Sequence, residues 1–163
     1  VTFGGFTASF AADERFHALS MPLDANWKFA VIIPDYEVRT ADARRAMPKE
    51  IAVKDSVFTT SHAIAMIEAL RSGSEELLAE ACQDVLHEPC RRKLIKDYDS
   101  VRASAKAAGA PAFFISGSGS TMIALTKSET VAERFIELVR ARHPNFAGHV
   151  LHAAADGVRV ETK

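Results

Sequence analysis

The sequence has few cysteines, no long apolar run and no excess of charge. Its two cysteines, Cys82 and Cys90, form neither a CxxC pair nor a Cys/His set with zinc spacing, which fits a reducing compartment. No stretch approaches the roughly 20 apolar residues that span a bilayer, and the first residues lack a signal-peptide pattern. The 20 basic and 21 acidic residues give a net charge of -1, too little to attract nucleic acid or an anionic membrane. We therefore expect a cytoplasmic protein without a nucleic-acid or membrane partner.

Length and composition predict one folded domain over residues 1–163. The sequence is 48% hydrophobic and 25% charged, as is ordinary for a globular protein, and it is long enough to bury a core. It opens on VTFGGFTASF, which alternates apolar and small residues without an initiating Met and is typical of the inside of a strand. The sequence is therefore expected to be a piece of a longer protein, or a processed one.

Hydrophobic periodicity and cap residues predict the elements of secondary structure. Helices are expected at 40–47, 55–70, 75–87, 97–108 and 128–143. Thr40 and Ser74 are the expected N-caps, Gly73 and Gly109 the expected stops, and Pro89 is expected to interrupt the helix before it. Strands are expected at 1–10, 28–34, 111–116, 121–126 and 149–162, the last turning at Asp156-Gly157, with a connection at 11–27.

This order of elements is that of the ferredoxin-like split βαβ fold. A strand, a group of helices, two strands joined by a tight turn, a helix and a final strand predict an α+β fold. In it, an antiparallel sheet carries helices on one face. That fold hosts many unrelated activities, so the function has to come from particular residues.

The tight turn lies inside FFISGSGSTMIAL, residues 113–125. Gly117 and Gly119 permit positive φ, and without side chains the N–H groups around them can converge on an anion such as phosphate. Glycine-serine turns are also routine in hairpins. The stretch matches neither a Walker A loop, which needs a Lys at its end, nor GxGxxG. The residues alone leave both a plain turn and a phosphate cradle open.

Three stretches carry a resemblance to a known family. ISGSGSTMIAL (115–125) resembles the third conserved motif of the GHMP kinases, with Ser120 where that family commonly has proline. VIIPDYEVRTADARRAMP (31–48) and DVLHEPCR (84–91) are similar to two motifs of the homoserine kinases within that family, the second with Cys90 at a usually aromatic position. GGFTAS (4–9) is similar to the entry strand of their carboxy-terminal half.

The resemblance implies a reaction and partners. Homoserine kinases transfer the γ-phosphoryl group of ATP to the hydroxyl group of L-homoserine in threonine biosynthesis, and they commonly form homodimers. The resemblance implies that this chain is the acceptor-binding, carboxy-terminal domain of a GHMP kinase. It further implies that the ATP-binding half is absent from the chain, and that ATP and Mg²⁺ are bound mainly by that half. The fragment alone is then expected to be inactive.

The resemblance also gives roles to particular residues. Arg44 and Arg91 are implied to bind the carboxylate of homoserine, to which a planar guanidinium offers two parallel N–H···O bonds. Asp84 and His87 are expected to orient Arg91 or to bond locally. Arg45 is expected at the surface, because helical neighbours differ by about 100° around the axis. One wall of the phosphate site is implied to consist of Gly117, Ser118, Gly119 and Thr121. No catalytic residue and no metal ligand is assigned within the chain.

Three other functions stay open at this point. The chain resembles GHMP kinases in general, so its acceptor can be mevalonate or a sugar. A stand-alone amino-acid-binding regulatory module would use Arg44 and Arg91 to bind a carboxylate without phosphorylating it. An interaction domain would instead dimerise through an exposed face of its sheet.

Overall fold

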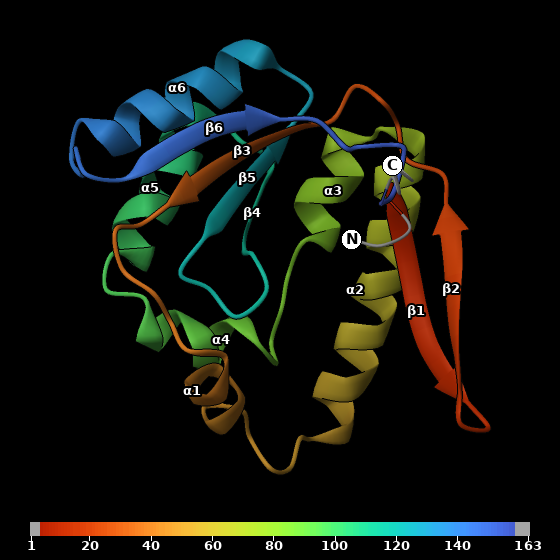
Figure 1. Ribbon diagram of the computed structural model, residues 1–163. Coiled ribbons are helices and arrows are strands. Elements are labelled where there is room, and N and C mark those ends of the chain that lie inside the picture. Colours follow the sequence, from red (N-terminus) through yellow and green to blue (C-terminus); the bar gives the residue numbers. More distant parts are fainter. Residues whose placement is uncertain (1–3, 159–163) are drawn as a thin grey trace, which may run out of the picture.

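The structure is a computed structural model that describes residues 4–158, and its main feature is an antiparallel sheet beneath two helices (Figure 1). Its four strands are β3 (Lys28–Ile33), β4 (Ala112–Ile115), β5 (Met122–Thr126) and β6 (Ala147–Leu151). They lie in the order β4-β5-β3-β6. This order, with helices between β3 and β4 and between β5 and β6, is the ferredoxin-like split βαβ arrangement. The predicted α+β, ferredoxin-like fold class is therefore confirmed, but helices pack on both faces of the sheet and not on one face as predicted.

The connection between β3 and β4 contains most of the helices. They are α1 (Thr40–Arg45), α2 (Val53–Ser72), α3 (Glu75–Ala81), α4 (Glu88–Arg91), the 3-10 turn η1 (Arg92–Leu94) and α5 (Tyr98–Ala108), and α6 (Glu129–Arg140) joins β5 to β6. As predicted, Ser74 caps α3, because its hydroxyl accepts the N–H of Leu77 at 3.1 Å. No helix in the described part of the chain is long and apolar enough to cross a membrane.

Several predicted element boundaries are wrong. Thr40 is the first residue of α1 rather than its N-cap, and no side chain caps that helix. The helix expected at 75–87 ends at Ala81, and Pro89 lies in the first turn of α4, where the missing N–H of proline costs nothing. The strand expected at 149–162 corresponds to β6, which ends at Leu151. Residues 1–3 and 159–162 of the predicted terminal strands lie outside the described residues.

The two faces of the sheet belong to different hydrophobic cores. Ala30 and Ile32 of β3 point to one face and Phe29 to the other, since side chains alternate along a strand. The first core lies against α5 and α6, and its buried members are Ala30, Ile32, Ile95, Tyr98, Val101, Ala105, Ala108, Met122, Ala124, Ala132, Phe135, Ile136, Val139 and Phe146. The second, smaller core contains Trp27, Ala69, Leu70, Leu78, Ala112 and Leu125. It holds the carboxyl end of α2, together with α3, against the sheet.

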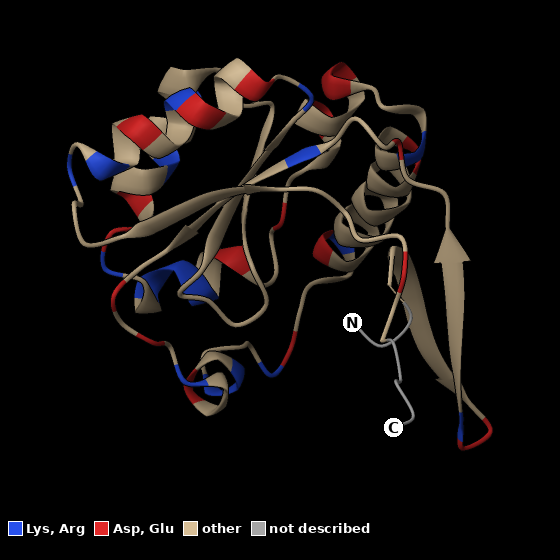
Figure 2. Ribbon diagram, turned by 45° about the horizontal axis from the view of Figure 1, so that its top comes forward, with Lys and Arg blue, Asp and Glu red and all other residues tan. Residues whose placement is uncertain are grey.

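A two-stranded hairpin, β1 (Phe6–Ala12) and β2 (Arg15–Met21), stands apart from the main sheet. The prediction that 11–27 is a connection missed β2. Figure 2 shows that charged residues occur on this hairpin only around its tip. Most of its apolar side chains are exposed, and Phe16 has 90% of its surface accessible. A hairpin of this kind has little stability by itself.

Gly73 is expected to be a stability determinant of the joint between α2 and α3. Its φ of +71° ends α2, and a Cβ atom there would lie 2.1 Å from Oδ2 of Asp24, which pairs with Lys127 at 3.1 Å. Gly109 is a matched control, because its φ is +89° but nothing lies within 4 Å of a Cβ atom. Gly109→Ala should lower the free energy of unfolding by about 1 kcal/mol through backbone conformation alone.

Gly73→Ala should cost clearly more than Gly109→Ala, because the ion pair must also move. Urea unfolding of the 163-residue chain measures both variants. Equal losses in the two variants would show that the crowding at Gly73 is relieved without cost.

Candidate functional site

The glycine-serine turn between β4 and β5 is a compact hairpin loop. The Ser116 N–H donates to the Thr121 carbonyl at 2.9 Å, and the Gly119 N–H donates to the Ser116 carbonyl at 3.0 Å. Gly117 and Gly119 have φ of +58° and +84°, and the Gly119-Ser120 peptide bond is cis. A Cβ atom on Gly119 would lie 2.8 Å from Cδ1 of Ile95. Position 119 therefore favours glycine for its backbone conformation, and a Cβ atom there would also displace the end of the Ile95 side chain.

The segment after β3 packs against this turn. The buried hydroxyl of Ser120 donates a hydrogen bond to the Tyr36 carbonyl. Thr40, at the start of α1, has its Oγ1 3.4 Å from Oγ of Ser118. Between the segment and the turn lies an open cavity of about 480 Å³, lined by residues 33–38 and 119–121. The stretch 31–48 therefore meets the stretch 113–125 in space.

Arg91 connects the stretch 84–91 to the same glycine-serine turn. It is the last residue of α4, and its Nη1 donates to the Gly117 carbonyl at 2.7 Å. Its Nε is buried and has no hydrogen-bond partner among the described residues. A buried N–H without a partner is costly, so this edge of the guanidinium is prepared for an acceptor.

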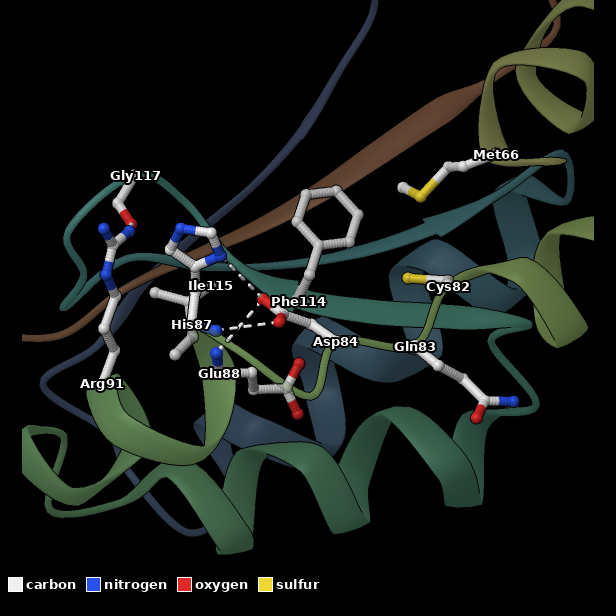
Figure 3. Close-up of a pocket in the computed structure, with 10 residues that line it drawn as sticks. All are labelled: Met66, Cys82, Gln83, Asp84, His87, Glu88, Arg91, Phe114, Ile115 and Gly117. Carbon is white, nitrogen blue, oxygen red and sulfur yellow. Dashed lines mark hydrogen bonds and ion pairs between the residues drawn. The ribbon is translucent and has the colours of Figure 1, made fainter. Parts of the chain in front are cut away.

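A cavity of about 390 Å³ lies beside Arg91, between α2, α4 and β4 (Figure 3). Met66 and Phe114 form an apolar side of it, and Asp84, His87 and Arg91 a polar side; its other lining residues are Cys82, Gln83, Glu88, Ile115 and Gly117. The cavity combines an apolar wall with a few polar groups, as is usual in sites for small molecules.

Two titratable groups near the cavity have shifted pKa values. Burial raises the pKa of Cys82 to about 11, with a further contribution from the Glu88 carboxylate. The thiol is therefore protonated at neutral pH and is no ready nucleophile. Burial also raises the pKa of Tyr98, whose hydroxyl donates to the Glu88 carboxylate. That bond ties the first turn of α4 to the core.

The structure brings together most of the residues that the sequence singled out. Arg91 touches the turn itself, and Gly117, Ser118, Gly119 and Thr121 all belong to it. Arg44 lies on α1 with an exposed side chain, and no hydrogen bond joins it to Arg91 in the described part of the chain. Arg45 is at the surface, where it pairs with Asp42.

Sequence reasoning missed two contacts that shape this site. In the sequence, Ser120 stands out only as a substitute for proline, whereas in the structure its hydroxyl bonds to the segment at Tyr36. Thr40 was expected to cap a helix, whereas it contacts Ser118. Both contacts join residues about 80 positions apart, so no local pattern signals them.

The described residues form no cluster typical of a metal site. No group of three or more His, Cys, Asp or Glu side chains in the described residues is arranged to hold a metal ion. Carboxylate and other oxygen groups are the ligands that Mg²⁺ prefers. We propose no Mg²⁺ ligand among the described residues.

A protein-family model matches the part of the chain that contains this site. The family model for the GHMP kinases C terminal matches residues 66–145, which include α4, the glycine-serine turn and α6. The chain belongs to the GHMP kinase family and is a carboxy-terminal domain of its fold.

Within that family the chain is similar to homoserine kinases. It is 40% identical over 122 residues to homoserine kinase from Caldicellulosiruptor bescii, which covers 75% of this chain and 40% of the relative. It is 33% identical over 162 residues to homoserine kinase from Aquifex aeolicus, covering 96% of this chain and 54% of the relative. The chain thus spans about half the length of the curated relatives it matches.

A solved structure gives the same result. The crystal structure of homoserine kinase from Cytophaga hutchinsonii superimposes with a TM-score of 0.84 and 29% sequence identity, covering 95% of this chain and 50% of that chain. The resemblance inferred from the three sequence stretches is therefore confirmed.

Proposed function

We propose that this chain is the acceptor-binding domain of a homoserine kinase, which transfers the γ-phosphoryl group of ATP to the hydroxyl group of L-homoserine in threonine biosynthesis. The observation that carries the proposal is the meeting of three stretches at one turn, where Arg91 bonds to Gly117 and Thr40 contacts Ser118. Phosphoryl transfer depends mainly on positioning and charge stabilisation. A domain that fixes the acceptor beside the phosphate site therefore contributes directly to the rate.

Arg91 is suited to the carboxylate of homoserine. Its Nη1 is held by the Gly117 carbonyl, whereas its buried Nε has no partner in the described part of the chain. The edge formed by Nε and Nη2 can therefore donate two parallel bonds to a carboxylate. Such a ligand also satisfies the buried Nε, whose unmet bond costs about 1–3 kcal/mol.

The turn has a second role in this proposal. Gly117, Ser118, Gly119 and Thr121 form one wall of the space around the transferred phosphoryl group, because their small side chains let the backbone N–H groups approach an anion. ATP and Mg²⁺ are bound mainly by an ATP-binding half outside this chain. No residue of the chain acts as the catalytic acid or base.

Exposed apolar surface supports packing of the domain against further protein. Along α2, Val53 and Ile64 have 81% and 65% of their surfaces accessible, and Phe16 of the hairpin is more exposed still. Apolar patches of this kind are typical of interaction surfaces. We place the ATP-binding half of the cytoplasmic enzyme there.

Homodimerisation of the enzyme is a further prediction, which light scattering tests.

The acceptor is tested by ADP release from MgATP in the kinase that carries this domain. Release should depend on L-homoserine, and mevalonate or a sugar should support little of it. Neither alternative has an α-amino acid group, and leaving the binding groups of a polar site unpaired is costly. Turnover of mevalonate or a sugar in preference to homoserine would refute the proposed acceptor.

Arg44→Ala is expected to raise KM for L-homoserine about tenfold and to leave KM for ATP unchanged. The factor corresponds to the loss of one charge-assisted hydrogen bond to the carboxylate. Arg45→Ala is the matched control, because the neighbouring Arg45 pairs with Asp42 at the surface. Steady-state kinetics with each substrate varied in turn measures both variants. If Arg44→Ala and Arg45→Ala both behave as wild type, Arg44 has no part in binding the acceptor.

A further inference from the structure

The turn that leads into α4 is organised around the carboxylate of Asp84. Its Oδ1 accepts the N–H groups of Leu86 at 2.7 Å and His87 at 2.8 Å. Its Oδ2 accepts the N–H of Glu88 at 3.1 Å and lies 3.5 Å from Nδ1 of His87 (Figure 3). Three successive backbone N–H groups therefore converge on one side chain.

These bonds give the first N–H groups of α4 the acceptors that the helix itself does not provide. The helix has only four residues, so its own hydrogen bonds cannot stabilise it. The first N–H groups of any helix have no partner within it. His87, the residue at the N-cap position, makes no side-chain cap bond. Asp84 therefore supplies the cap from outside the helix.

The same turn determines where Arg91 points. The Arg91 N–H donates to the His87 carbonyl at 2.9 Å, and the His87 N–H donates to Asp84. One helical turn thus links the Asp84 carboxylate to the backbone of Arg91. From there the guanidinium reaches the Gly117 carbonyl at 2.7 Å, and both residues line the cavity (Figure 3).

We propose that Asp84 is a positioning residue for Arg91. Its carboxylate fixes α4 so that Arg91 bonds to Gly117 and presents its Nε edge to the carboxylate of the acceptor. This inference rests on the proposed function for the identity of that acceptor. Both oxygens of Asp84 accept backbone N–H groups at the start of α4, which assigns the carboxylate to holding that turn. Its effect on the reaction therefore passes through Arg91.

Kinetics of the full kinase test the proposal. Asp84→Ala removes three bonds to the backbone and should raise KM for L-homoserine on the order of tenfold, with KM for ATP within about twofold of wild type. Asp84→Asn keeps the Oδ1 acceptor and should have a smaller effect, so it keeps the test informative if the alanine variant fails to fold. Asp99→Asn, at an exposed acidic residue in the first turn of α5, is the control and should change nothing.

A double-mutant cycle separates positioning from a general loss of structure. In an Arg91→Ala background, Asp84→Ala should change KM for homoserine by less than about twofold, since Arg91 is no longer there to be positioned. The same tenfold effect in both backgrounds would overturn the proposal. So would a parallel change in kcat and in KM for both substrates.

A measurement without substrate distinguishes failure of this inference from failure of the proposed function. Asp84→Ala should shift the NMR signal of the Arg91 Nε–Hε group and speed hydrogen exchange at Leu86, His87 and Glu88, whereas Asp99→Asn should do neither. If these changes occur but the wild-type kinase does not phosphorylate homoserine, the function is wrong and the positioning role stands. An unchanged Arg91 signal in Asp84→Ala would refute the positioning role, whatever the substrate.

Discussion

Replacing Arg91 with alanine is expected to lower kcat/KM for L-homoserine by about 100- to 1,000-fold in the kinase that carries this domain. The change removes two charge-assisted hydrogen bonds to the acceptor carboxylate, each of which contributes about 1.5–3 kcal/mol. The lower figure for both bonds corresponds to a factor of about 100. The change also removes the bond from Nη1 to the Gly117 carbonyl, so the glycine-serine turn loses a hydrogen bond to α4. Steady-state kinetics with homoserine varied at saturating MgATP measures the loss.

Two further variants make this result specific. Arg91→Lys keeps the charge but offers a point donor in place of a fork, so it should lose roughly tenfold. Arg92→Ala is the control, because Arg92 is the exposed neighbour at the start of η1 and should behave as wild type. A wild-type kcat/KM in Arg91→Ala, or an equal loss in Arg91→Ala and Arg92→Ala, would contradict the assignment of the carboxylate to Arg91.

The centre of the main sheet could be predicted because its strands β3 and β5 are largely buried on both faces. The run from Phe29 to Ile32 is apolar without interruption, and the structure points alternate residues of it into two separate cores. The β2 strand has no such signal, since nearly all of its residues are exposed. Its turn contains Asp13 and Glu14 at φ of 47° and 63°, without the glycine or asparagine that marks a tight hairpin turn. Neither burial nor turn chemistry therefore reveals the hairpin in the sequence.

The sequence could predict the residues of the site that lie within motifs, but not the contacts between those motifs. Gly117 and Gly119 need positive φ, and Arg91 stands in a stretch that resembles a family motif, so each could be singled out in advance. The bond between Arg91 and Gly117 spans 26 positions and depends on how α4 packs against β4. The resemblance implies that Asp84 orients Arg91 or bonds locally, but the sequence does not show that it caps α4, because apolar residues continue the helical pattern of α3 past its end. The Glu88-Pro89 pair after Asp84 is a helix-start signal that would have located α4.

Truncating Trp27 should have the largest effect on stability. Trp27 is only 1% exposed in the second core, and its Nε1 donates to the Leu70 carbonyl at 2.9 Å. Trp27→Ala should lower the free energy of unfolding by about 3–5 kcal/mol, through lost burial and the cavity that remains. That loss is a large part of the total stability of a typical domain. The Leu70 carbonyl keeps its bond from the Asp24 N–H at 3.0 Å, so it is not left without a partner.

The stability measurement needs a probe other than fluorescence, because Trp27 is the single tryptophan of the sequence. Urea unfolding of the 163-residue chain followed by circular dichroism at 222 nm avoids this problem. Phe16→Ala is the control, since it truncates an aromatic side chain that is 90% exposed and should change stability by less than about 0.5 kcal/mol. Trp27→Phe refills most of the volume and should lose less stability than the alanine variant, because it lacks only the indole N–H bond and part of the ring.

Equal losses in Phe16→Ala and Trp27→Ala would mean that the second core does not hold α2 and α3 against the sheet. Arg91 would then depend for its position on the first core and the Asp84 turn alone.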